Sequence, residues 1–371
     1  MSRKFFYVAI LVVLVASLVG CAPKAATTTT TGGKIKIGLS FSDYATERWP
    51  VESAQMTQLL QKMGYEVIAQ EADHDVKLQS DQIDNMVSQG VKGLIVIAED
   101  GAAAVTPVNK AAAAGVPVIS YDRLIKTDKI AAYISFDNVE VGKQEALGVM
   151  KALGLPGSTT WTKDNPAKVV LSGGSPTDNN ATLVRQGQKS VYQPFVDSGV
   201  IKIVADQWVD NWDPAKAESM MENILTAQQN KIDAVIASDD GTALGELQAM
   251  KAQGLAGKVP ISGQDATADG CNSIVKGEQT VTVFKDTRLL APQAVTMIDA
   301  LVKGQKLTGL TTYTLAILTG DKSLSGSIQA NFLKVVQVTK DNVYDVVVKS
   351  GFQSYDNVYR GIPADQLPPR P

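Results

Sequence analysis

Short apolar runs alternate along this chain with segments whose apolar residues recur every three or four positions. Runs such as GLIVIAE (93–99) and AKVVLSGG (167–174) are almost continuously apolar, which is typical of strands covered on both faces. The segment SAQMTQLLQKMG places apolar residues at the spacing i, i+3, i+4, i+7 and stops at Gly64, as an amphipathic helix does. This alternation predicts βαβ units and parallel sheets, and hence an α/β fold.

The predicted strands form two series separated by a loop. The stretch at 155–165 is rich in Gly, Pro, Ser, Thr and Asp and predicts a surface loop. Strands are expected at 34–41, 65–70, 93–99, 116–122, 132–137, 167–174, 201–209, 233–239, 259–265 and 280–285. A chain of 371 residues has room for two domains, so we expect two α/β lobes in tandem, although no exact sequence repeat is present.

The N-terminal residues follow a different pattern. A positive head at 3–4 precedes an apolar run at 5–19, which is shorter than the roughly 20 residues needed to span a bilayer core. Such a head, run and small residue before a cleavage point predict a secretory signal peptide at 1–20. The sequence LVGC, ending at Cys21, resembles the lipobox of bacterial lipoproteins, which implies that this cysteine is acylated.

The segment that follows the predicted cleavage point has almost nothing to bury. Residues 21–33 are Ala, Pro, Lys, Thr and Gly after the cysteine, and they predict a flexible tether. We therefore expect an exported protein, anchored to the outer face of the cell membrane by lipid on Cys21. An ordinary signal peptide or a membrane anchor, with cysteine present by chance, is the alternative.

Composition excludes several classes of function. The formal net charge is −3 with no long basic run, so no nucleic-acid partner is expected. The cysteines are Cys21 and Cys271, so a lipidated Cys21 leaves no intrachain disulfide. The single histidine, His74, lies among charges and is expected to be solvated. Without a second histidine or a CxxC motif, neither a metal site nor a cofactor is predicted, and a His-dependent triad is unsupported.

Polar and aromatic residues follow nearly every predicted strand. Ligands of open parallel sheets bind beyond the carboxyl ends of the strands. The residues at those ends include Glu47, Arg48, Trp49, Asp122, Arg123, Asp178, Asn179, Asn180, Asp210, Asn211, Trp212, Asp239, Asp240, Asp265 and Lys285. Asp, Asn and Arg each present two in-plane atoms to neighbouring hydroxyls, and tryptophan presents a flat apolar face. Carbohydrate is therefore the ligand that this set of residues fits best.

Each of these residues also has a purely structural explanation when it is taken alone. An Asp or Asn after a strand is often only the N-cap of the next helix. Asp122 and Arg123 could form a surface ion pair, and Lys285 could be solvated. Trp49 or Trp212 could be core packing. The functional interpretation therefore depends on the whole collection at one edge of the sheets.

Longer motifs reveal a family resemblance. The segments ERW, SYDR, YISFDN, GGSPTDNNA, DQWVDNW, IDAVIAS and SGQDA follow one another between about Lys34 and about Asn342. In this order they resemble the D-xylose-binding proteins of bacterial ABC transporters, within the pentose/hexose-binding periplasmic family. The resemblance implies a type I periplasmic binding protein fold, in which two Rossmann-like lobes joined by three crossing strands close on one sugar.

The resemblance also implies bounds for the lobes. An N-terminal lobe is expected at 34–138 and about 286–312. A C-terminal lobe is expected at 139–285 and about 313–345. The proline-rich end, 346–371, continues beyond the resemblance and is expected to trail as a tail.

The family's ligand residues can be carried over motif by motif. They imply that the sugar lies between Trp49 and Trp212. The residues implied to contact its hydroxyls are Arg48, Asp122, Arg123, Asp178, Asn180, Asp239, Asp265 and Lys285. Two positions depart from the family, because Asp239 replaces an asparagine and Phe284 replaces a tyrosine. A carboxylate in place of an amide loses two donors and adds a charge, so affinity or sugar preference is expected to differ.

These expectations define a receptor and not an enzyme. The resemblance implies a monomeric, extracytoplasmic substrate-binding lipoprotein of an ABC importer, which binds D-xylose and docks on membrane permease subunits. Glucose, another monosaccharide or several sugars are the alternative ligands, and a sensor kinase is an alternative partner. A glycosidase needs a pair of carboxylates in acid and base roles, whereas the carboxylates here have amide or cationic neighbours. A sugar-responsive repressor would need a helix-turn-helix where the signal peptide stands.

Overall fold

The computed structural model describes residues 33–371. The predicted signal peptide at 1–20, the predicted lipidation of Cys21 and most of the predicted tether lie outside the described residues. None of the helices between residues 33 and 371 has the length and apolarity that crossing a membrane requires.

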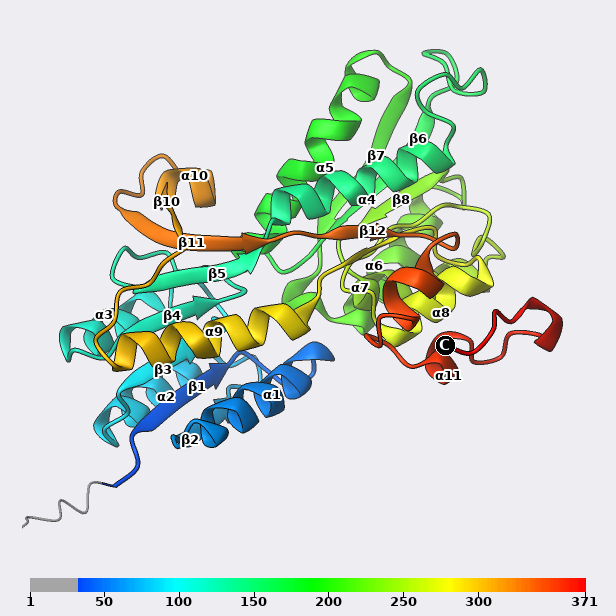
Figure 1. Cartoon of the computed structure of the whole chain (residues 1–371). Coiled ribbons are helices and arrows are strands. Elements are labelled where there is room, and N and C mark those ends of the chain that lie inside the picture. The colour runs from blue at the N-terminus through cyan, green and yellow to red at the C-terminus, as the bar shows by residue number, and fades with distance from the viewer. Residues whose placement is uncertain (1–32) are drawn as a thin grey trace, which may run out of the picture. The chain divides into compact units, whose positions relative to one another are not determined.

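The first sheet has seven strands in the order β10-β11-β5-β4-β3-β1-β2 (Figure 1). Neighbouring strands run parallel except for β10 and β11. The strands are β1 (Lys36–Phe41), β2 (Glu66–Glu71), β3 (Gly93–Val96), β4 (Val118–Tyr121), β5 (Ala132–Phe136), β10 (Thr311–Thr314) and β11 (Ser327–Leu333). We call this sheet and its helices the N-terminal lobe.

Helices cover both faces of the first sheet. On β3, Ile95 faces one apolar core and Val96 faces another, because successive strand residues point to opposite sides. The core around Ile95 includes α1 (Arg48–Lys62) and α9 (Thr287–Val302), and the core around Val96 includes α2 (Val76–Ser88), α3 (Val105–Ala113) and α10 (Leu315–Thr319). Burial on both faces explains the continuously apolar strands seen in the sequence.

A second set of elements forms the C-terminal lobe. Its parallel sheet has the order β7-β6-β8, and a separate pair, β9 and β12, is antiparallel. The strand predicted at 259–265 is reduced to a single parallel bridge between Val235 and Ile261. The elements are α4 (Asn138–Ala152), β6 (Ala167–Gly173), α5 (Asn179–Asp197), β7 (Ile201–Trp208), η1 (Asp210–Trp212), α6 (Pro214–Ala227), β8 (Ala234–Ala237), α7 (Asp240–Ala252), α8 (Ala268–Lys276), β9 (Thr282–Phe284) and β12 (Val336–Val338).

Three chain segments connect the lobes. They run from β5 into α4, from β9 into α9, and from β11 into β12 (Figure 1). The first and third lie side by side, since the amide of Asp137 donates to the carbonyl of Leu333 at 3.1 Å. The fold class expected from the sequence, two α/β lobes joined by three crossing segments, is confirmed.

The assignment of residues 313–333 to the C-terminal lobe is wrong. This stretch contributes to β10 and β11, and β11 pairs in parallel with β5 in the first sheet. Only β12 of the predicted segment joins the C-terminal lobe, where it pairs with β9. The other lobe bounds stay a prediction.

The C-terminal residues do not trail as a tail. Val347, Val348, Val358 and Tyr359 are buried in one core with Cys271 of α8. Short helical turns carry these side chains: η2 (Tyr344–Val348), α11 (Tyr355–Val358) and η3 (Ala364–Gln366). Asn272 fastens the segment further by donating to the carbonyls of Val358 and Arg360 at 2.8 and 2.9 Å. Apolar burial therefore fixes a stretch whose prolines suggested a loose end.

Candidate functional site

The residues predicted to bind the ligand all line one cavity of about 40 Å³, which we call the inner cavity. The predicted residues in its lining are Arg48, Trp49, Asp122, Arg123, Asp178, Asn180, Trp212, Asp239, Asp265 and Lys285, and the sequence missed Thr46 and Gln264. Both lobes contribute, because α1 and the end of β4 face the starts of α5 and α7. The edge where parallel strands end thus gathers residues that are more than 200 positions apart in the chain.

Arg48 is the centre of a network of carboxylates. Its Nε lies 2.5 Å from Oε1 of Glu52, one helical turn later, and its Nη1 lies 3.0 Å from Oδ2 of Asp122. The same Nη1 is 3.6 Å from Oδ1 of Asp265 in the other lobe. Burial alone would lower the pKa of Arg48, but the three carboxylates raise it well above its ordinary value. The guanidinium therefore stays charged and is held in one orientation.

Glu52 is a site residue that the sequence analysis missed. It is fully buried and also accepts a short hydrogen bond from the hydroxyl of Tyr121. Burial raises its pKa, against the opposing effect of Arg48. The i,i+4 spacing of Arg48 and Glu52 on one helix was the available signal.

Asp122 links the two lobes through its backbone and its side chain. It has a left-handed conformation with φ 59°, which turns the chain directly after β4. Asn180 of the C-terminal lobe donates to its carbonyl at 3.1 Å and to its Oδ1 at 3.0 Å. Burial would raise the pKa of Asp122, but Arg48, Lys285 and Arg123 lower it below its usual value. Asp122 is therefore an ionised acceptor in the cavity wall.

Arg123 forms the second ion pair between the lobes. Its Nε lies 3.1 Å from Oδ2 of Asp178, and its Nη1 lies 3.4 Å from Oε2 of Glu99. The side chains of Asp122 and Arg123 are both buried, which excludes the alternative that they form an ion pair on the surface. The guanidinium thus presents a fixed charge to the inner cavity.

His74 is not a solvated histidine. Its side chain is 20% exposed, and Nδ1 lies 3.2 Å from Oε2 of Glu99 and 3.8 Å from Oδ2 of Asp43. These three side chains could offer ligand atoms within 4.8 Å of one another. Arg123 contacts the same Glu99 oxygen, so a cation already stands beside this cluster. The Glu99 carboxylate is therefore shared between Arg123 and His74 in the described structure.

The two tryptophans occupy different settings. Trp49 is 2% exposed and packs against Phe41 in the core of the N-terminal lobe. It therefore contributes to the core and also lines the inner cavity. The ring of Trp212 rests against the backbone of Gly174, where any side chain larger than hydrogen would overlap it. Its Nε1 donates to Oδ2 of Asp178 at 3.3 Å. Only glycine leaves room for this ring on the strand end.

Two of the carboxylates serve as helix caps as well. Asp178 accepts from the amide of Asn180 at the start of α5, and Asp239 accepts from the amides of Thr242 and Gly241 at the start of α7. The capping explanation is therefore correct for both, and each still lines the inner cavity. Burial raises the pKa of Asp239 to about 6, against the hydrogen bonds that lower it.

Several buried polar atoms of the lining have no hydrogen-bond partner among residues 33–371. Trp49 Nε1 and Gln264 Oε1 have none, and both side chains are less than 5% exposed. Asp122 Oδ2 and Asp265 Oδ1 have cations nearby, at 3.0 Å from Arg48 and from Lys285, but no aligned hydrogen bond. Buried polar groups are nearly always satisfied in native proteins. Donors and acceptors that converge unpaired on one cavity therefore indicate a polar ligand.

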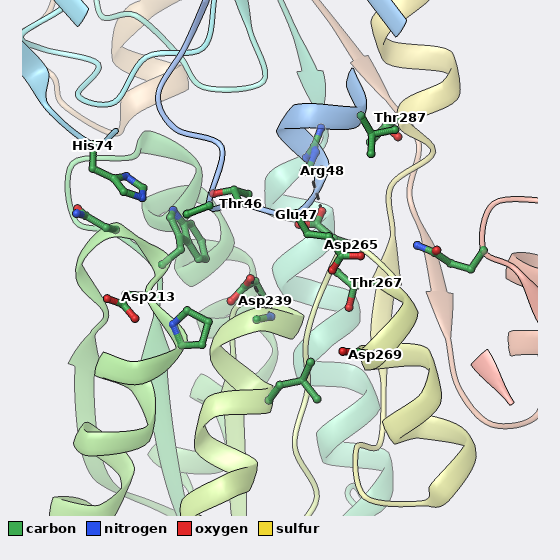
Figure 2. Close-up of a pocket in the computed structure, with 18 of the residues that line it drawn as sticks. Thr46, Glu47, Arg48, His74, Asp213, Asp239, Asp265, Thr267, Asp269 and Thr287 are labelled. Carbon is green, nitrogen blue, oxygen red and sulfur yellow. Dashed lines mark hydrogen bonds and ion pairs between the residues drawn. The ribbon is translucent and has the colours of Figure 1, made fainter. Parts of the chain in front are cut away.

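A second and larger cavity adjoins the inner one, and we call it the outer cavity. It has a volume of about 690 Å³ and shares Thr46, Arg48, Trp212, Asp239 and Asp265 with the inner cavity. Figure 2 shows side chains from the start of α1 facing those of the C-terminal lobe across this space. Its wall also includes Phe352 and Gln353 of the C-terminal segment, which the sequence had not connected with the site.

Comparison with known proteins places this site in context. The model of a family described as periplasmic binding protein domain matches residues 37–306. The D-xylose-binding periplasmic protein of Escherichia coli (strain K12) is 40% identical over 86% of this chain and 91% of its own length. The multiple sugar-binding periplasmic receptor ChvE of Rhizobium radiobacter is 35% identical over 87% of this chain and 92% of its own length.

A solved structure is similar over the same range. It is an ABC transporter solute binding protein from Clostridium phytofermentans with bound β-D-glucose. It superposes with a TM-score of 0.77 and 29% identity, and the similarity covers 87% of this chain and 99% of that one.

Proposed function

Since the chain belongs to the periplasmic binding protein domain family and is a sugar-binding receptor of ABC transport with no enzymatic role, we propose that its ligand is D-xylose. The observation that carries the proposal is the inner cavity, where every predicted ligand residue meets and several buried polar atoms have no partner within residues 33–371. The D-xylose-binding relative, at 40% identity, supports the choice of sugar.

The proposed mechanism is closure of the two lobes on the sugar. Arg48, Asp122 and Arg123 would bond hydroxyls from the N-terminal lobe, and Asp178, Asn180, Asp239, Asp265 and Lys285 from the C-terminal lobe. Trp49 and Trp212 would cover the two faces of the ring. A ligand that touches both lobes gains its full set of contacts only in the closed state, so it favours that state by this difference in affinity. The closed receptor would then dock, as a monomer, on membrane permease subunits.

A broader sugar range is the second candidate. The relative named as a multiple sugar-binding receptor and the glucose-bound structure both favour it, as does the charge at Asp239. Hydroxyl-binding side chains alone do not reject a ring with one more substituent; rejection requires a steric clash or an unpaired group. The measured range of sugars decides between the two candidates.

Isothermal titration of the full chain should give binding of xylose with a Kd in the micromolar range or tighter, about −8 kcal/mol or better. We expect Trp212→Ala to weaken this binding at least about tenfold, because it removes an aromatic face of the ring site. Trp161→Ala is the matched control, since Trp161 donates to Leu153 outside the inner cavity. Comparable binding of glucose, ribose, arabinose or galactose would support the broader range, and no heat with any of the five sugars would contradict a sugar receptor.

The pH dependence of sugar binding should depend on Asp239. With a pKa of about 6, its carboxyl is protonated at pH 5, where it can donate as an amide does, and ionised at pH 8. We expect xylose to bind about three- to tenfold more tightly at pH 5, the effect of one hydrogen bond. Asp239→Asn should bind equally well at both pH values, whereas the exposed Glu222→Gln should keep the wild-type dependence. A pH dependence that survives Asp239→Asn would assign it to another carboxylate of the site.

We also propose that Cys21 carries the lipid that anchors the receptor outside the cell. The LVGC sequence supports this, together with the extracytoplasmic location of the family. Intact-mass measurement of the membrane fraction should show cleavage before Cys21 and an acylated N-terminus. Cys21→Ala should leave the chain unacylated, and an unmodified Cys21 in the wild-type chain would contradict the proposal.

A further inference from the structure

The outer cavity shares part of its wall with the inner one and is far larger. The volumes are about 690 and about 40 Å³, and the two cavities share Arg48, Trp212, Asp239 and Asp265 in their walls. Pockets of about 300–1,000 Å³ enclose ligands of drug size, so the outer cavity has room for more than one pentose ring. We propose that it is a second subsite, which holds a further sugar unit when a disaccharide or glycoside places its first ring in the inner cavity.

This inference rests on the proposed function, because the inner cavity must hold the first ring. The shared residues define the connection between the subsites. Trp212 and Asp239 line both cavities, so a glycosidic bond that joined a ring in each cavity would lie beside these two side chains. The ligand class is therefore a short saccharide with one ring in each cavity.

The outer wall has the mixed surface that a sugar ring requires. Phe352, Pro214 and Leu244 contribute apolar faces, whereas Thr267 and Thr287 contribute hydroxyls. Sugar rings likewise have an apolar C–H face and a polar edge, which suits aromatic and polar side chains in combination. In Figure 2 the labelled threonines and carboxylates border the same space.

The C-terminal segment fixes the aromatic part of this wall. Phe352 packs edge-on against Phe284 with ring centroids 4.6 Å apart, and the Arg288 guanidinium lies 5.4 Å from its centroid. Arg288 Nη1 also donates to the carbonyl of Ser350 at 2.7 Å. On the other side, Gln353 Nε2 donates to the carbonyl of Ala266 at 3.1 Å. The ring of Phe352 is thus held in place before any ligand arrives, which lowers the entropy cost of binding.

Carboxylates in the wall of the outer cavity supply acceptors. Among residues 33–371, neither Glu47 nor Asp213 has an ion-pair partner, whereas Asp269 pairs with Arg360 at 2.9 Å. Burial, and then the charges of Asp269 and Asp265, raise the pKa of Glu47. Hydrogen bonds from sugar hydroxyls would therefore stabilise the Glu47 carboxylate, because they supply donors and add no negative charge.

The test is calorimetric titration of the full chain with xylose and with β-1,4-xylobiose, or with glucose and cellobiose if glucose is the monosaccharide that binds. We expect the disaccharide to bind, and to be displaced competitively by the monosaccharide. Phe352→Ala should weaken disaccharide binding about five- to tenfold and change monosaccharide binding less than twofold. Glu47→Gln should act in the same direction, because it removes the charge of an acceptor that has no ion-pair partner among residues 33–371. Tyr355→Ala is the matched control, because Tyr355 lies in the same segment but not in the cavity wall.

The outcomes separate the two proposals. Binding of the monosaccharide without the disaccharide overturns the second subsite and leaves the proposed function intact. Binding of neither sugar overturns the proposed function. A disaccharide affinity that Phe352→Ala and Glu47→Gln change no more than Tyr355→Ala does, or that falls in step with the monosaccharide affinity, also overturns the second subsite.

Discussion

Replacing Arg48 by methionine is expected to abolish measurable sugar binding and to lower the free energy of unfolding by about 3 kcal/mol. Arg48 contacts Glu52, Asp122 and Asp265 at 2.5, 3.0 and 3.6 Å, so its loss takes the cation from buried Glu52 and the nearest cation from buried Asp122, while Asp265 keeps Lys285 at 3.0 Å. Removing one partner of a buried ion pair costs far more than the pair contributes, because the remaining charge stays desolvated. Urea denaturation and xylose titration, both at pH 7.5, measure the two effects.

Two further variants show which property of Arg48 matters. Arg48→Lys keeps the charge but loses the planar fork that reaches Glu52 and Asp122 together, so we expect intermediate stability and weak binding. Arg360→Met is the control for loss of an arginine ion pair, since Arg360 pairs with Asp269 at 2.9 Å but is 63% exposed. The control should change stability by less than about 1 kcal/mol. If Arg48→Met behaved like the control in both measurements, Arg48 would have no organising role in the site.

The protein should lose stability as the pH rises from 6 to 8. Burial raises the pKa of Asp240 and of Glu246 to about 8, from 3.8 and 4.5. A carboxyl whose pKa is raised by folding stabilises the fold fully below the unfolded pKa, and this stabilisation is lost as the pH rises through the folded pKa. Each group should therefore cost about 2 kcal/mol of unfolding free energy between pH 6 and 8. Urea titrations at pH 6, 7 and 8 measure the slope.

The surroundings of the two carboxyls explain why they resist ionisation. Neither oxygen of Glu246 has a hydrogen-bond partner in the part of the chain that the structure describes, and the side chain is fully buried. Asp240 accepts from Gln279 Nε2 at 2.7 Å and from the amide of Thr267 at 2.9 Å, but the described structure places no cation against it. Glu145, in the same lobe, also has a pKa raised by burial and adds to the effect.

A matched pair of variants tests whether Glu246 causes the loss of stability between pH 6 and 8. Glu246→Gln should remove about half of the loss between pH 6 and 8, because glutamine does not ionise, whereas the exposed Glu222→Gln should leave it unchanged. In the acid range, stability should instead fall as the pH falls. Folding lowers the pKa of Asp122 below its ordinary value of 3.8, so the stabilisation that its carboxylate contributes is lost as the pH falls below that value. Because the loss from the raised carboxyls begins just above their ordinary pKa values of 3.8 and 4.5, maximal stability is expected at about pH 4 to 5. Stability that stays constant from pH 6 to 8 would contradict the burial of neutral carboxyls.

The sequence by itself determined the α/β class and the order of the main strands, and its resemblance to a known family implied ten of the twelve residues that line the inner cavity. These features are readable because the apolar periods that define strands and helices are local. The residues that end parallel strands must also meet at one edge, whatever lies between them. Asp178 and Asp239 show that one residue can both cap a helix, as the local sequence predicts, and line the inner cavity.

Only the tertiary structure decided which distant segments pair and what becomes buried. Nothing local to residues 313–333 shows that β11 pairs with β5 and not with the second sheet. The C-terminal segment looked loose because its prolines are local signals, whereas its valines reach a core formed by α8. His74 was expected to be solvated for the same reason, since the Glu99 carboxylate beside it is brought close only by folding. Desolvation depends on every neighbour at once, so the raised pKa values and the outer cavity belong to the folded chain and to no single motif.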